Sequence, residues 1–173
     1  EIFHSLKSKL KSKGLNTNVG DEGGFAPNIN SSEEVIELII SAVTSAGLKM
    51  KEDILLSLDV ASTEFFENSK YHLRGENKIL DSDNMVSYLK NLRNSYPIFS
   101  IEDGMSEDDW GGWKNLTNEI GSTTQLVGDA DGRWKALRVR KGRGRSRWHP
   151  AQPPRLGCVA RLRDGNNWRR RAP

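Results

Sequence analysis

Three short apolar runs, each followed by an acidic residue, constrain the fold of this chain more than any other feature. The runs span residues 54–58, 98–101 and 125–127, and the acids that follow them are Asp59, Glu102 and, after one glycine, Asp129. A nearly continuous apolar run is typical of a strand that is buried on both faces of a sheet. We therefore expect three buried strands with a carboxylate at or just beyond the C-terminal end of each.

Helical patterns alternate with these runs, and a short hairpin arm is expected at residues 70–74. Ser31 and Glu34 form a capping box before one helix, and Gly47 follows that helix as a terminator. The residues expected to face the core are Ile2, Phe3, Leu6 and Leu10; Val35, Leu38, Ile39, Ala42 and Val43; Met85, Leu89 and Leu92; and Trp110, Trp113 and Leu116. Strands that alternate with helices predict a parallel α/β arrangement.

The strand-end acids have two interpretations. A single acid after a strand is most often a turn former or a helix cap. Three acids that end successive parallel strands would instead meet at one mouth of a barrel, where active sites lie. Because packed carboxylates repel each other, such a cluster needs a cation. Oxygen ligands suit Mg²⁺, and the absence of a nearby histidine in the sequence argues against zinc.

A fourth acid, Glu22, differs in kind from the other three. It lies in the stretch NVGDEGGFAP, next to Asp21 and between Gly20 and Gly23. The simpler interpretation is a solvated acidic turn. A glutamate that such a turn holds beside a metal could instead work as a general acid or base.

Four ordered motifs carry a family resemblance. The stretches NVGDEGGFAPNI, SLDVASTEFF, SIEDGMSEDDWGGW and QLVGD closely resemble enolase, the glycolytic phosphopyruvate hydratase. The resemblance covers about residues 1–129 and implies a partial TIM-type (β/α) barrel of the enolase C-terminal domain. It also implies a Mg²⁺-dependent, reversible dehydration of 2-phosphoglycerate to phosphoenolpyruvate.

The same resemblance implies a role for each acid. Asp59, Glu102 and Asp129 would be the Mg²⁺ ligands, Glu102 and Asp129 would also contact the substrate, and Glu22 would be the acid that assists departure of the hydroxyl group. The lysine base and the phosphate-binding Arg-Ser pair of the family cannot be placed in this sequence. We therefore expect a fragment, truncated at both ends, that is inactive by itself. The resemblance implies a cytoplasmic homodimer for the intact enzyme.

Another enolase-superfamily enzyme, such as a racemase or epimerase, is the rival within the resemblance. It would use the same three acids on a different substrate. The stretches GDEGG and EDDW argue against it, because they resemble enolase proper.

Residues 130–173 form a second segment of opposite charge. From Gly132 to Pro173 there are 14 basic residues and one acid, which leaves 12 of the 26 basic and 22 of the 23 acidic residues for the rest of the chain. A run of like charge predicts a disordered arm. We interpret it as frameshifted or otherwise non-native sequence. The alternative is a nucleic-acid-binding arm, because RVRKGRGRSRW is basic and Trp134, Trp148 and Trp168 could stack on bases. No apolar run approaches a membrane span, and the single cysteine, Cys158, fits a reducing cytosol.

Overall fold

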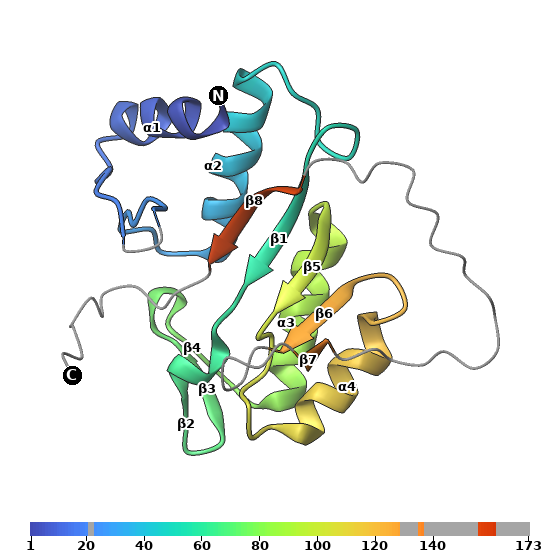
Figure 1. Cartoon of the computed structure of the whole chain (residues 1–173). Coiled ribbons are helices and arrows are strands. Elements are labelled where there is room, and N and C mark those ends of the chain that lie inside the picture. Colours follow the sequence, from blue (N-terminus) through green and yellow to red (C-terminus); the bar gives the residue numbers. More distant parts are fainter. Residues whose placement is uncertain (21–22, 129–134, 137–155, 162–173) are drawn as a thin grey trace.

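The computed structural model describes residues 1–20, 23–128, 135–136 and 156–161 (Figure 1). The helices are α1 (Ile2–Ser12), α2 (Ser32–Ser45), α3 (Ser82–Ser95) and α4 (Trp110–Ile120), with 3-10 turns η1 (Ser62–Phe65) and η2 (Arg74–Glu76). The strands are β1 (Leu55–Asp59), β2 (Phe66–Glu67), β3 (Lys70–Leu73), β4 (Lys78–Leu80), β5 (Ile98–Glu102), β6 (Gln125–Gly128), β7 (Lys135–Ala136) and β8 (Leu156–Arg161).

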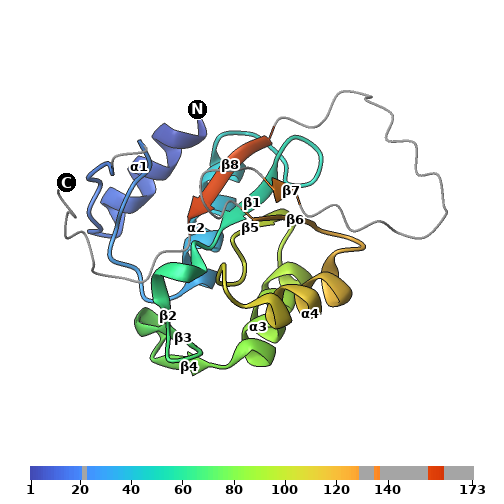
Figure 2. The same ribbon diagram turned by 60° about the horizontal axis from the view of Figure 1, so that its bottom comes forward.

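The main sheet has the strand order β7-β6-β5-β1-β8. Its strands β6, β5, β1 and β8 are parallel, and β7 alone pairs antiparallel. The crossover from β1 to β5 contains α3, and the crossover from β5 to β6 contains α4. Figures 1 and 2 show these two helices beside each other on one side of the sheet. The predicted parallel α/β arrangement is confirmed.

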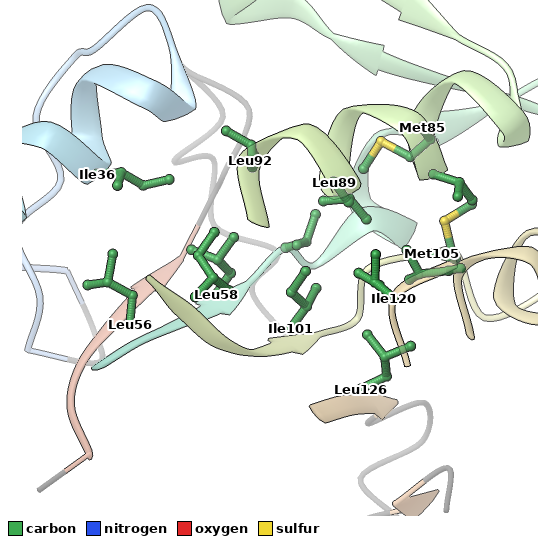
Figure 3. Packing of buried hydrophobic residues seen from close by; sticks show 14 of the residues in the cluster. Ile36, Leu56, Leu58, Met85, Leu89, Leu92, Ile101, Met105, Ile120 and Leu126 are labelled. Carbon is green, nitrogen blue, oxygen red and sulfur yellow. The ribbon is translucent and has the colours of Figure 1, made fainter. Parts of the chain in front are cut away.

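The core lies between this sheet and its helices. Leu89 and Leu92 of α3 project towards Leu58 and Ile101 of the two central strands (Figure 3). All four side chains are at most 2% exposed. They belong to a larger cluster of buried apolar residues, and the burial of such side chains is the main term that stabilises a fold. The opposite side of β1 and β5 is therefore left for residues at alternate positions, which include the strand-end acids.

Side chains cap three of the helices, one of them as the predicted capping box. Ser31 accepts a hydrogen bond from the backbone N–H of Glu34 at 3.2 Å, and Asp109 accepts one from Gly112 at 2.8 Å. Asp81 caps α3 in the same way. Each such bond satisfies a backbone donor that the helix itself leaves unpaired.

Two residues expected to face the core are exposed, Phe3 of α1 (43% exposed) and Trp110 of α4. Trp110 is 71% exposed, because it is the first residue of α4 and lies one turn beyond the buried stripe of Trp113, Leu116 and Ile120. In α2 the predicted residues Leu38, Ile39, Ala42 and Val43 are buried, and Ile36 is buried as well, whereas Val35 is half-buried and packs against the core. The predicted face of α2 is therefore confirmed except at its first position.

The hairpin arm predicted at residues 70–74 is β3, the central strand of the small antiparallel sheet β2-β3-β4. Its Tyr71 is fully buried and joins this sheet to the start of α4. The Tyr71 hydroxyl donates to Oδ2 of Asp109 at 2.8 Å and accepts from the N–H of Ser106 at 3.0 Å. Burial is the main cause that raises the pKa of Tyr71, so this hydroxyl stays a donor at neutral pH.

Two short segments of the basic tail are described as strands, and the expectation of a disordered arm stays a prediction for the rest. Lys135–Ala136 pairs with β6, and Leu156–Arg161 pairs with β1. An edge strand carries unpaired N–H and C=O groups, which another segment of extended chain can satisfy. The tryptophans proposed for base stacking and the stretch RVRKGRGRSRW lie outside the described residues. Within the described part of the chain, no helix is long and apolar enough to cross a membrane.

A buried carboxylate network joins the second 3-10 turn to α2 and α3. Oε1 of Glu76 accepts from the Ser32 N–H at 3.1 Å and from the Tyr88 hydroxyl at 2.7 Å. Its Oε2 accepts from Nζ of Lys78 at 2.8 Å, and the Glu76 side chain is only 8% exposed. Burial alone would raise the pKa of Glu76, but these hydrogen bonds outweigh it and lower the pKa below its ordinary value.

We expect Glu76→Gln to lower the free energy of unfolding by about 1–3 kcal/mol at neutral pH, as for other hydrogen bonds to a charged group. Because the folded-state pKa is lowered, the stabilisation by Glu76 is fully present above the ordinary glutamate pKa. It is lost as the pH falls through the folded-state pKa. Urea unfolding at a series of pH values should therefore show the wild type and the variant converging in acid.

Glu52→Gln is the matched control, because Glu52 pairs with Lys49 on the surface, where its side chain is 69% exposed. We expect it to change the free energy of unfolding by less than about 1 kcal/mol. A difference between wild type and Glu76→Gln that stays constant down to strongly acidic pH would contradict the prediction.

Candidate metal-binding site at the strand ends

Two of the four predicted site residues lie side by side. Asp59 is the last residue of β1, Glu102 is the last residue of β5, and the two are partners in the parallel pairing. Register partners on neighbouring strands point to the same face of a sheet, about 4.8 Å apart along the hydrogen-bonding direction. Asp59 is 7% exposed and Glu102 is half-buried. The expectation that strand ends bring these acids together is confirmed for this pair, while their role as ligands stays a prediction.

The residues one layer below the acids are polar as well. Ser57 and Ser100 are register partners, and the Ser100 hydroxyl donates to the Ser57 hydroxyl at 2.8 Å. Side chains alternate between the faces of a strand, so these serines share the face of Asp59 and Glu102. The intervening residues, Leu58 and Ile101, are buried on the helix side. One face of the β1–β5 pair is thus apolar, and the other is polar at its carboxyl end.

Tight turns follow both acids. Ala61 and Asp103 have φ angles of 48° and 47°, in the left-handed region that residues other than glycine seldom adopt. Hydrogen bonds cross between the two turns: the N–H of Val60 donates to the Glu102 carbonyl at 2.9 Å, and the N–H of Ser62 donates to the Asp103 carbonyl at 3.1 Å. The N–H of Asp103 in turn donates to the carbonyl of Val127 in β6 at 2.9 Å. The carboxyl ends of three parallel strands are therefore tied together.

Asp59 and Glu102 fit a hard divalent cation. Two carboxylates on adjacent strands concentrate negative charge, which a cation stabilises. Their oxygens are the donors that Mg²⁺ prefers. Among the described residues, no group of three or more His, Cys, Asp or Glu side chains could hold a metal. Asp129, the predicted third ligand, lies outside the described residues and follows the last residue of β6 in sequence.

Glu22, the predicted acid, also lies outside the described residues, but its flanks confirm a tight reversal of the chain. The N–H of Gly20 donates to the carbonyl of Gly24 at 2.9 Å, and Val19 forms an antiparallel bridge with Phe25. Gly23 has a φ angle of 82°, which only glycine adopts at no steric cost. Of the described glycines beside the acidic pair, Gly23 is the one with a left-handed φ angle.

Ser62 and the left-handed turns belong to the site and carry little signal in the sequence. Ser62 is one small hydroxyl residue in a strand-exit loop, and a hydroxyl residue at such a position most often forms a local turn. The stretch VAST contains no glycine that would point to a left-handed residue. The close approach of two strand ends from distant parts of the chain produces these features.

One known protein family matches most of this chain. The family model described as "Enolase, C-terminal TIM barrel domain" matches residues 1–142. The match includes all four predicted site residues and extends beyond residue 129, where the resemblance of the motifs ends; the division into 1–129 and 130–173 stays a prediction. The parallel sheet with its helical crossovers and the acids at the strand ends agree with part of such a barrel. The chain belongs to the family of enolase C-terminal TIM barrel domains.

Proposed function

We propose that this chain is part of a Mg²⁺-dependent lyase that interconverts 2-phosphoglycerate and phosphoenolpyruvate. The observation that carries the proposal is the register pairing of Asp59 with Glu102 at the carboxyl ends of adjacent parallel strands. Family membership supports the enolase superfamily, and the motifs GDEGG and EDDW favour enolase proper over a racemase or epimerase.

Each acid has a separate task in this proposal. Asp59, Glu102 and Asp129 would hold Mg²⁺, with Glu102 and Asp129 also facing the substrate. Glu22 would donate a proton to the departing hydroxyl group, as a general acid within hydrogen-bonding reach of it. The bound ion supplies positive charge where the substrate carboxylate becomes more negative during proton removal. The chain's own contribution is to hold these carboxylates in a fixed relation before the substrate arrives.

The proton next to the substrate carboxylate also needs a base. The resemblance assigns that task to a lysine on a later barrel strand, and no lysine of residues 1–173 can be placed in that position. We therefore expect the purified chain to bind Mg²⁺ but not to turn over 2-phosphoglycerate. The parent enzyme is proposed to be cytoplasmic and homodimeric.

Isothermal titration calorimetry of the full chain with Mg²⁺, followed by an assay of phosphoenolpyruvate release, tests both parts. Injection of MgCl₂ into buffer without protein provides the blank. Heat of Mg²⁺ binding without product is the expected result. Turnover would contradict the missing base, and absence of Mg²⁺ binding would contradict the metal role. Tighter binding of 2-phosphoglycerate than of unphosphorylated hydroxy acids in the presence of Mg²⁺ would favour enolase over the racemase and epimerase rivals.

A further inference from the structure

Ser62 connects the two strand ends that carry the acids. It is fully buried, and it follows Asp59 by three residues. Its hydroxyl donates to the backbone carbonyl oxygen of Asp103 at 2.6 Å, and its N–H donates to the same oxygen at 3.1 Å. Asp103 is the residue directly after Glu102. Ser62, in the loop that follows β1, is therefore hydrogen-bonded to the backbone directly after the second acid.

The hydrogen bonds of Ser62 join two residues or their neighbours that have unfavourable backbone conformations. Ala61, directly before Ser62, and Asp103, which accepts both of its bonds, are the two left-handed residues of the strand exits. Residues in this region persist only where their surroundings hold them in place. A further hydrogen bond, from the N–H of Val60 to the Glu102 carbonyl at 2.9 Å, also lies directly after the acids. The two strand exits are thus joined by several hydrogen bonds on the C-terminal side of both acids.

We propose that Ser62 is a positioning residue that sets the spacing of the Asp59 and Glu102 carboxylates for a divalent cation. The inference rests on the proposed function, because Mg²⁺ is the ion that this spacing would serve. Mg²⁺ requires near-ideal octahedral geometry with short bonds to oxygen, so it tolerates little displacement of a ligand. Loss of a group that orients metal ligands typically weakens metal binding by about 10–100-fold.

A purely structural role for Ser62 is the alternative, since any buried carbonyl needs a donor. The chain offers a matched control in Ser100, whose hydroxyl bonds to Ser57 at 2.8 Å between the same two strands. Both serines link β1 and β5 or their exits through a hydroxyl group. Only Ser62 acts at the level of the strand exits, beyond the acids, whereas Ser100 lies one layer below them.

The test compares the full chain with its Ser62→Ala and Ser100→Ala variants by calorimetric titration with MgCl₂ and by urea unfolding. We expect both variants to unfold at lower urea concentration than the wild type. Only Ser62→Ala should raise the dissociation constant for Mg²⁺, by about 10–100-fold. If Ser62→Ala does not fold, Ser62→Cys keeps the packing with a weaker donor, and it should shift the constant in the same direction.

Each result decides between the two roles. If the wild type binds Mg²⁺ and the two serine variants bind it equally well, the positioning role is wrong while the proposed function stands. If the wild type binds no Mg²⁺, the proposed function fails, and the positioning role fails with it because it rests on that ion. Faster amide exchange of Val60 and Asp103 in Ser62→Ala than in Ser100→Ala would then assign Ser62 the purely structural role.

Discussion

The Asp59→Asn variant is expected to lose Mg²⁺ binding, with an affinity more than about 100-fold below that of the wild type. The substitution keeps the size of the side chain but removes its charge, at a position that is only 7% exposed. Removal of an outer-shell partner typically costs about 10–100-fold in metal affinity, and loss of a ligand charge should cost more. Asp59 therefore carries the largest expected effect on binding.

Calorimetric titration measures this effect directly, and urea unfolding measures it independently. A ligand that binds only the native state raises the free energy of unfolding by about 2.7 kcal/mol at 100 times its dissociation constant. The wild type should show this rise with Mg²⁺, and Asp59→Asn should not. Asp108→Asn makes the same change on the exposed loop before α4 and should bind like the wild type. Wild-type affinity in Asp59→Asn would remove Asp59 from the site.

The Leu89→Ala variant is expected to have the largest effect on stability, a loss of about 2–5 kcal/mol in the free energy of unfolding. Leu89 is fully buried in the core between α3 and the sheet (Figure 3). A β-carbon built on Gly104 would lie 3.2 Å from its Cδ1, which shows how closely the side chain is surrounded. Truncation leaves a cavity that close-packed neighbours fill only in part.

Urea unfolding without added metal is the measurement for Leu89→Ala. Ile79→Ala is the control, because Ile79 is 62% exposed and its truncation should cost less than about 0.5 kcal/mol. A loss below about 1 kcal/mol in the free energy of unfolding of Leu89→Ala would contradict the close packing of Leu89 in the core.

Gly104→Ala tests whether Gly104 and Leu89 pack directly against each other. Gly104→Ala alone should destabilise, because the new β-carbon would lie 3.0 Å from Leu116 and 3.1 Å from Ile101 in addition to its approach to Leu89. In the Leu89→Ala background, part of that crowding is gone and the neighbours can shift into the cavity. The double variant should therefore lose less stability than the sum of the two single variants. Additive losses would contradict direct packing of these residues.

Much of the local structure could be predicted from the sequence. The runs at 54–58, 98–101 and 125–127 give the strands β1, β5 and β6, and Ser31 makes the capping bond that its position suggests. These features depend on neighbours a few residues away, so periodicity and capping preferences are sufficient to find them.

The burial of individual helical residues was less predictable. Trp110 and Trp113 are three positions apart and read as one stripe, yet Trp110 is 71% exposed and Trp113 only 7%. Periodicity gives the direction of a helix face but not the point at which the helix leaves the sheet. The two strands of the tail show the same limit, because charge composition does not describe the free sheet edges with which β7 and β8 pair.

The candidate site divides in the same way. The positions of the carboxylates at the strand ends follow from the sequence, because the apolar runs and the acids after them are neighbours in the chain. That Asp59 lies opposite Glu102 follows from the pairing of the strands. The β1–β5 pairing shifts register between Leu56 and Ser57, and a slip of one residue would turn side chains to the other face of the sheet.

Ser62 depends on the tertiary structure most of all. Its hydroxyl reaches the carbonyl of Asp103 across 41 residues of sequence. A hydroxyl group can bond to almost any nearby acceptor, so its partner is set by which loops the parallel strands bring together. Residue type and local spacing thus determined the chemical groups and their places on the strands, whereas strand register and loop closure decided which of those groups meet, because both depend on contacts between distant segments.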